Sequence, residues 1–256
     1  MTDTGVKPAT PDLRSLTAAR VSLPMSGHSI ATSEVLEFQL AHAQARDAVH
    51  AALDAEAFAR RLRNELPTLQ EQAVEVLTLR SCAVDRASYL RHPQRGRTLH
   101  ADSAAALKSM PCDLAISVAD GLSALAVETN AIPLLAVLLP KLGEAGWTLA
   151  PVTVVEQGRV GIGDAIGERL AARCSLMLIG ERPGLSAADS MGAYLTWGPR
   201  AGRTDAERNC LSNIRSGGLN VEEAAERLMR LMKRARAMEL TGMALKEGVV
   251  TSLLER

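Results

Sequence analysis

Short apolar runs that alternate with longer segments of helical periodicity constrain the fold of this chain more than any other feature. Such alternation favours parallel strands, because each helix carries the chain back to the edge where the next strand begins. We therefore expect an α/β fold, Rossmann-like, with a mainly parallel sheet and helices on both faces. The predicted strands cover residues 73–79, 114–118, 152–155, 176–179 and 193–197, and the predicted helices cover 122–143, 162–173, 185–191, 204–215 and 221–241.

The first part of the chain follows a different pattern. Residues 1–30 are rich in Thr, Ser, Pro and Gly and show little periodicity, so we expect a flexible N-terminal arm there. Residues 31–66 are expected to form an N-terminal helical segment, as one long helix or two. Polar residues such as Asp47 and His50 lie on or near its inner stripe, which is typical of a helix that packs against a partner or another domain. The α/β domain would then span residues 67–256.

Charge and composition exclude several classes of partner. Lys and Arg number 29, as do Asp and Glu, so the formal net charge is zero and binding to nucleic acid through phosphate contacts is not expected. Two residues each of Phe, Tyr and Trp are too few to stack along a single strand. A near-neutral chain tends to associate, which is expected of a subunit in a hetero-oligomer.

We expect no membrane span and no secretory signal, and therefore a cytoplasmic protein. The apolar stretch over residues 122–142 contains Glu128, Pro133 and Lys141, which favour a buried helix over a membrane span. The N-terminus lacks a basic segment followed by an apolar run. Cys82, Cys112 and Cys174 are expected to be buried thiols, and no Cys or His spacing indicates a metal site.

Polar loops follow four of the predicted strands. They contain Asp120-Gly121, Glu156-Gln157-Gly158, Glu181-Arg182-Pro183-Gly184 and Gly198-Pro199. Ligands of open α/β sheets bind at the carboxyl ends of the strands, and glycine there lets a ligand approach the backbone. The same residue types are ordinary in turns, so one loop alone indicates little. Four such loops on one edge together favour a ligand site.

Two further motifs leave alternatives open. Gly161, Gly163 and Gly167 form G-x-G-x-x-x-G, which is one residue too long for the dinucleotide fingerprint and indicates nucleotide binding only weakly. Cys210, in the segment predicted as a helix over residues 204–215, is either a small buried residue or a thiol facing a ligand pocket. Since no His lies near it in the sequence, we do not expect a nucleophile.

Several segments, in this order and spacing, resemble the small (light) subunits of adenosylcobalamin-dependent ethanolamine ammonia-lyase. The matching pieces cover residues 38–50, 85–90, 118–124, 155–160, 179–184 and 204–214. The resemblance spans residues 36–245 and implies that residues 67–256 are a cobalamin-binding domain. It also implies a large-subunit partner that holds the substrate, a higher-order hetero-oligomer, and a place in a bacterial microcompartment.

The resemblance further implies that Val160, Glu181 and Cys210 contact the cofactor. The broad corrin faces suit an aliphatic residue such as Val160, and the amide side arms suit Glu181. The motif D-x-H-x-x-G is absent, so adenosylcobalamin is expected to keep its own lower base (base-on). The implied reaction starts with Co–C homolysis and yields acetaldehyde and ammonia. We expect no catalytic residue in this chain and no activity from it alone.

Two other functions stay open on the sequence. The G-x-G-x-x-x-G piece would suit a Rossmann-type nucleotide-binding oxidoreductase, which would bind NAD(P)H tightly as an isolated chain. The N-terminal arm would suit a non-enzymatic scaffold of a protein shell, which would fail to assemble without residues 1–30.

Overall fold

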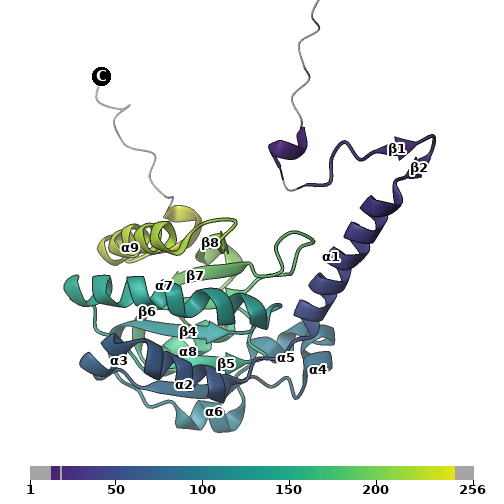
Figure 1. Ribbon diagram of the computed structural model, residues 1–256. Helices are drawn as coiled ribbons and strands as arrows, with labels where there is room; N and C mark the ends of the chain where they lie inside the picture. Colours follow the sequence, from purple (N-terminus) through teal and green to yellow (C-terminus); the bar gives the residue numbers. More distant parts are fainter. Residues whose placement is uncertain (1–12, 18, 246–256) are drawn as a thin grey trace, which may run out of the picture.

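A six-stranded sheet forms the centre of the fold, as the computed structural model shows (Figure 1). The structure describes residues 13–17 and 19–245. The strands are β3 (Val76–Arg80), β4 (Cys112–Ala119), β5 (Val152–Glu156), β6 (Ala172–Gly180), β7 (Met191–Trp197) and β8 (Asn209–Ile214). They lie side by side in the order β3-β5-β4-β6-β7-β8.

This sheet is mixed. Strands β3, β5, β4 and β6 are parallel, as predicted, whereas β7 and β8 run antiparallel to their neighbours. The helix predicted at 185–191 is wrong, because residues 181–190 contain none. Only the short 3-10 turn η2 (Asp205–Glu207) lies between β7 and β8. Without a crossover helix the chain cannot return to the opposite edge, so consecutive strands pair antiparallel.

The helix predicted over residues 204–215 is also wrong, because this stretch contains β8. Its two buried apolar residues, Leu211 and Ile214, are three positions apart, which is a helical spacing. Both face the core because the register between β7 and β8 shifts there and Asn213 adopts a positive φ of 61°. A β-bulge of this kind adds one residue to the strand and interrupts the period of two.

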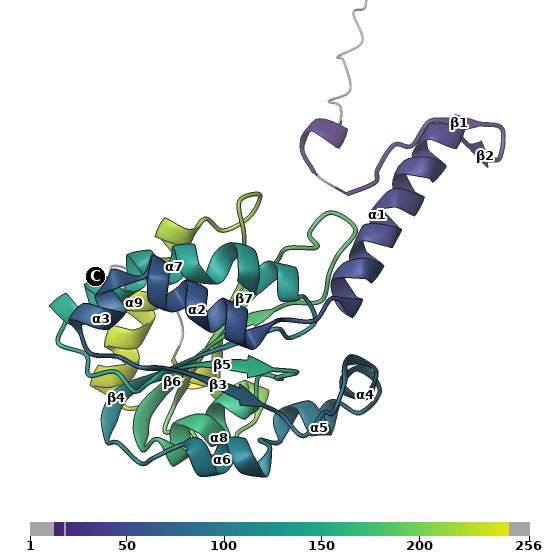
Figure 2. The same cartoon turned by 60° about the horizontal axis from the view of Figure 1, so that its bottom comes forward.

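Helices cover both faces of the sheet (Figure 2). One face carries α2 (Ala55–Glu65), α3 (Pro67–Glu71), α7 (Ala124–Glu144) and α9 (Val221–Met238), and the other carries α6 (Ala101–Ala106) and α8 (Ile162–Arg169). In β6, Leu176 and Leu178 join the larger core under α7, whereas Met177 and Ile179 join the smaller core under α8. Since α8 packs chiefly on β4 and β6, the described residues place no helix on this face of β7 and β8.

Helix α7 confirms the helix predicted over residues 122–143. It is long and apolar enough to cross a membrane by length and composition alone. Val127, Leu134 and Leu138 are nevertheless fully buried, and the helix packs on the sheet beside α9. The Ser123 side chain caps it by accepting a hydrogen bond from the backbone N–H of Ala126. The helix therefore has the packing of a core helix.

The predicted helical segment over residues 31–66 forms two helices, α1 (Thr32–His50) and α2. Phe58 and Leu62 of α2 pack in the larger core, whereas α1 leads away from the sheet (Figure 1). The flexible arm was predicted over residues 1–30, of which 1–12 and 18 lie outside the described residues. The described part contains η1 (Leu13–Ser15), β1 (Met25–Ser26) and β2 (Ser29–Ile30).

Two short helices, α4 (Arg86–Arg91) and α5 (Pro93–Arg97), lie beyond the end of β3 (Figure 2). The turn η3 (Gly242–Ala244) follows α9. Asp85 caps α4 by accepting a hydrogen bond from the backbone N–H of Ser88, and Pro93 opens α5. These helices contact the loops at the carboxyl ends of β4 and β5, where the candidate site begins.

Candidate functional site

The carboxyl ends of the parallel strands β4, β5 and β6 meet at one edge, as predicted. Asp120, Gln157 and Glu181 directly follow these strands. The fourth predicted loop, Gly198-Pro199, lies at the opposite edge because β7 is antiparallel. The N–H of Gly198 donates to the carbonyl of Arg173, near the start of β6, at 2.8 Å. The prediction that all four loops share one edge is therefore wrong for this loop.

Asp120 is fully buried and has partners within the protein. Its Oδ2 lies 3.1 Å from Nη1 of Arg86, and its Oδ1 accepts from the N–H of Gly158 at 3.1 Å. Burial raises the pKa of Asp120 to about 6, although the Arg86 guanidinium opposes the rise. Arg86 also donates to the carbonyls of Gly121 (2.8 Å) and Val49 (2.7 Å). Asp120 lies in one of the loops predicted to bind a ligand, but through Arg86 its carboxylate fastens α4 and α1 to the sheet.

Helices α4 and α5 support the turn that carries Val160. The Tyr89 hydroxyl donates to the carbonyl of Gly158 at 3.1 Å, and the N–H of Arg159 donates to the carbonyl of Gly96 at 2.8 Å. The Arg159 guanidinium lies 4.2 Å from the Tyr89 ring centroid. Val160 itself is half-buried and packs against the smaller core, on the α8 side of the sheet.

The helix-free part of this face presents Tyr194 of β7 and Cys210 of β8, which are paired across the two strands. Their neighbours Ala193, Leu195 and Leu211 face the larger core, so Tyr194 and Cys210 face the α8 side. Tyr194, like Val160, packs against the smaller core. Cys210 and Ser212 are exposed, and their Sγ and Oγ atoms lie 3.3 Å apart.

Glu181 reaches this face from the end of β6. Its Oε2 accepts from the Ser190 hydroxyl at 2.5 Å and from the backbone N–H of Asn213 at 3.1 Å. The bulge in β8 aims that N–H at the carboxylate. Gly192 lies beside the side chain, because a Cβ there would be 3.0 Å from Oε1. Oε1 receives no hydrogen bond from the described residues, so it can accept one from a ligand.

The titratable side chains Tyr194 and Cys210 beside Glu181 are neutral at neutral pH. Although Cys210 is exposed as a residue, the surrounding protein removes part of the water from its thiol and raises the thiol pKa, and the nearby Glu181 carboxylate adds to the rise. Burial raises the pKa of Tyr194 as well, with further rises from Cys210 and Glu181. A protonated thiol is a weak nucleophile. The face therefore offers one carboxylate oxygen, a thiol and an aromatic ring to a ligand.

The structure thus brings the three predicted contact residues, Val160, Glu181 and Cys210, to one side of the sheet. Their role as cofactor contacts stays a prediction. Sequence reasoning missed Tyr194 and the bulge at Asn213. A strand assignment over residues 209–214 would have paired β7 with β8 and pointed to Tyr194, but the helical spacing of Leu211 and Ile214 concealed that strand.

The glycines of G-x-G-x-x-x-G have a packing role. A Cβ at Gly163 would lie 3.3 Å from the Met177 side chain, and one at Gly167 would lie 2.7 Å from Pro199. They let α8 approach the sheet and the loop after β7, which accounts for them without a nucleotide. Among the described residues, no three His, Cys, Asp or Glu side chains gather as a metal site.

Comparisons with known proteins agree with the resemblance noted in the sequence. The family model described as ethanolamine ammonia-lyase light chain (EutC) matches residues 7–246. The chain is 47% identical over 256 residues to the ethanolamine ammonia-lyase small subunit of Pseudomonas syringae pv. tomato, covering 97% of this chain and 87% of that one. It is 50% identical to the small subunit of Pseudomonas putida W619 over 241 residues, covering 92% and 86% of the two chains.

A third relative, the ethanolamine ammonia-lyase small subunit of Azotobacter vinelandii, is 48% identical over 249 residues, covering 95% of this chain and 90% of the relative. Each relative is thus matched along most of its own length, and the family model spans nearly all of this chain. The chain therefore belongs to the ethanolamine ammonia-lyase light chain family.

Proposed function

We propose that this chain is the small subunit of an ethanolamine ammonia-lyase and forms one wall of an adenosylcobalamin site, which a large subunit completes. Membership of the family supports the lyase activity. The observation that carries the site is the convergence of Glu181, Tyr194 and Cys210 on a sheet face without a covering helix.

The residues on this face fit the cofactor. Corrin is a broad ring with apolar faces and amide side arms, and a flat sheet surface of small residues such as Gly192, Cys210 and Ser212 can lie against it. Val160 adds an aliphatic contact. Glu181 can accept a hydrogen bond from an amide N–H through Oε1, since its Oε2 is already bonded to Ser190 and Asn213.

When bound, adenosylcobalamin supplies the radical chemistry that releases ammonia from ethanolamine. The side chains of this subunit bind and orient the ring and keep water from that side of it. We assign them no proton transfer to or from the substrate. The neutral Cys210 and Tyr194 and the internally paired Asp120 agree with a role in binding alone.

We propose that the cofactor binds base-on, with its own lower base. In cobalamin proteins that replace the lower base by a protein histidine, this histidine belongs to the motif D-x-H-x-x-G. This chain lacks that motif. The nearest histidine in the sequence to Val160 is His100, which caps α6 by accepting a hydrogen bond from the N–H of Asp102 through its Nδ1.

We also propose assembly with the large subunit into a higher-order hetero-oligomer. The exposed apolar residues Leu36, Phe38 and Leu40 on α1 support an interface, since such groups are commonly covered in assemblies. A cytoplasmic location, inside a bacterial microcompartment, is the expectation that follows from the family resemblance.

Replacement of Glu181 by Ala tests the site. In a complex with the large subunit, Glu181→Ala should weaken adenosylcobalamin binding by about tenfold or more, because a hydrogen bond to a charged group is lost. The thermal midpoint should fall by only a few degrees, through loss of the acceptor of the Ser190 hydroxyl and the Asn213 N–H. Spectrophotometric titration of the complex gives the dissociation constant.

The matched control is Glu223→Ala, which removes an exposed carboxylate on α9 that pairs only with Arg227 in the described residues. This variant should bind the cofactor as the unaltered complex does. Unchanged affinity in Glu181→Ala would remove Glu181 from the site and leave the proposed face without its one charged contact.

A further inference from the structure

A buried ion pair between Arg208 and Asp164 joins the two elements that carry the proposed cofactor contacts. Asp164 lies in the first turn of α8, four residues after Val160, and Arg208 lies two residues before Cys210. The pair is nearly inaccessible to solvent, with 8% of Arg208 and 2% of Asp164 exposed. Charged residues are seldom buried to this extent unless they are paired.

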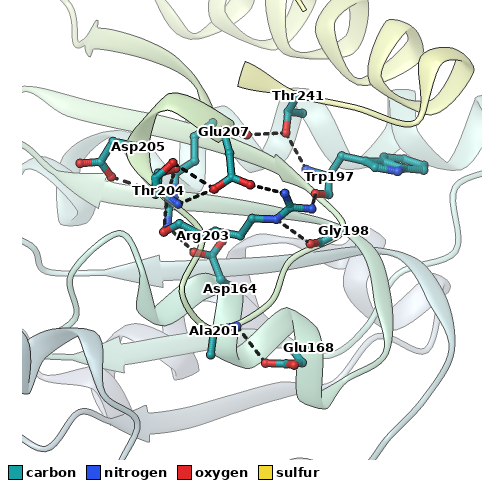
Figure 3. A network of polar contacts seen from close by, with 11 residues as sticks. Asp164, Glu168, Trp197, Gly198, Ala201, Arg203, Thr204, Asp205, Glu207 and Thr241 are labelled. Carbon is teal, nitrogen blue, oxygen red and sulfur yellow. Dashed lines mark hydrogen bonds and ion pairs between the residues drawn. The ribbon is translucent and has the colours of Figure 1, made fainter. Parts of the chain in front are cut away.

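The Arg208 guanidinium is held in one position by carbonyl groups as well as by Asp164. Its Nη1 donates to the carbonyl of Thr204 at 2.5 Å, and its Nη2 donates to the carbonyl of Arg203 at 3.0 Å and to the Asp164 carboxylate. Figure 3 shows Asp164 pointing from α8 toward Arg203 and Thr204 in the loop before β8. A Cβ at Gly161 would lie 3.8 Å from Nη2, so the guanidinium packs against the turn that contains Val160.

Among the described residues, no backbone hydrogen bond joins α8 directly to β8 or to the loop before it. Helix α8 packs on β4 and β6, whereas β8 is paired with β7. The side chains of Arg208 and Asp164 bridge the remaining separation. Buried ion pairs often contribute little net stability compared with apolar groups of the same size, but they fix geometry through directed hydrogen bonds.

We infer that Arg208 and Asp164 are positioning residues, which set the separation between Val160 and Cys210 and thereby the shape of the surface that holds the corrin. This inference rests on the proposed function. It concerns the arrangement of the contact residues, and neither Arg208 nor Asp164 itself touches the cofactor.

The test measures stability and cofactor affinity separately in the complex with the large subunit. The double variant Asp164→Leu, Arg208→Met replaces the pair by apolar groups and leaves no buried charge. Its thermal midpoint should stay within about 3 °C of the unaltered complex. Its dissociation constant for adenosylcobalamin, from spectrophotometric titration, should rise by about tenfold or more, as for other outer contacts that orient a binding group.

A second variant keeps the inference testable if the double variant fails to fold. Arg208→Lys retains the charge but places all its donors on one nitrogen, so it cannot reproduce the contacts that Nη1 and Nη2 make at separate positions. Its affinity should fall while its midpoint stays near that of the unaltered complex. Unaltered affinity in the double variant, or in Arg208→Lys where the double variant does not fold, would overturn the inference.

Asp113→Asn is the matched control for an ion-paired acid. Asp113 lies near the start of β4, at the edge of the sheet opposite to Glu181. Its carboxylate oxygens are 3.6 Å from the guanidinium groups of Arg173 and Arg236. Its replacement should lower the midpoint without changing cofactor affinity. If Glu181→Ala weakens binding while the Arg208 variants do not, the positioning role alone is refuted. If Glu181→Ala also binds normally, the proposed site itself is refuted.

Discussion

At the scale of single residues, two glycines allow the loops after β4 and β6 to interlock. A Cβ at Gly121 would lie 2.2 Å from the carbonyl oxygen of Gly180, and one at Gly180 would lie 2.0 Å from that of Ser123. Gly121 also has a positive φ of 55°. Since the Gly180 position directly precedes Glu181, this close approach sets where the Glu181 side chain leaves the sheet.

Gly180→Ala should therefore destabilise the fold by about 2–4 kcal/mol, because the added methyl meets backbone atoms that cannot turn away. Urea unfolding monitored by circular dichroism measures the loss. Gly184→Ala in the same loop is the control, since a Cβ there meets no atom closer than 3.9 Å. Equal stability of the two variants would show that the loops do not interlock in this way.

At the scale of elements, the connection between β7 and β8 is held by hydrogen bonds centred on Glu207 (Figure 3). The Glu207 carboxylate accepts from the N–H of Thr204 at 2.8 Å and pairs with Arg203, and the Thr241 hydroxyl donates to the Glu207 carbonyl at 2.7 Å. The bond between the Thr204 N–H and the Glu207 carboxylate belongs to a capping box on η2. The same connection positions Arg208 and the start of β8.

The backbone hydrogen bond from Thr204 lowers the pKa of Glu207 to about 2, with a further contribution from Arg203. Because the folded pKa lies below the unfolded value of about 4.3, the charged form stabilises the fold above that value. This contribution declines as the pH falls from about 4 toward 2. Glu207→Gln should thus be less stable than the unaltered chain at pH 7, with a smaller difference near pH 3.

Urea unfolding midpoints of the Glu207→Gln variant and of the unaltered chain, taken at several pH values, measure this difference in stability. A gap that is constant from pH 7 to pH 3 would mean that the Glu207 charge does not stabilise the connection.

At the scale of the whole molecule, the sheet order places β7 and β8 outside the strands on which α8 chiefly packs, β4 and β6. Helices α7 and α9 cover one face along β6, β7 and β8, whereas the opposite face of β7 and β8 is covered by no helix in the described residues. Cys210 and Ser212 are exposed on this uncovered face. Such a face is suited to be covered by a ligand and a partner chain.

The isolated chain should accordingly release no ammonia from ethanolamine, even with adenosylcobalamin present. Addition of the large subunit should restore deamination, because the substrate is expected to bind to that partner. A coupled assay for acetaldehyde measures both states. Turnover by the isolated chain would contradict the proposed division of roles between the subunits.

Local patterns in the sequence determined much of this protein. The alternation of apolar runs with helical segments predicted β3 to β6 and the buried helix α7, since burial of a strand or helix leaves its own period in the sequence. It also placed Glu181 at the carboxyl end of β6. The family resemblance then selected Val160, Glu181 and Cys210.

Tertiary structure alone decided the rest, because pairing partners and bulges depend on residues distant in the chain. The antiparallel pairing of β7 and β8 followed from connections without a helix, and the bulge at Asn213 turned a helical spacing into a strand. Only that strand places Cys210 opposite Tyr194 and beside Glu181. Likewise, no local pattern in the sequence indicates that Arg208 pairs with Asp164.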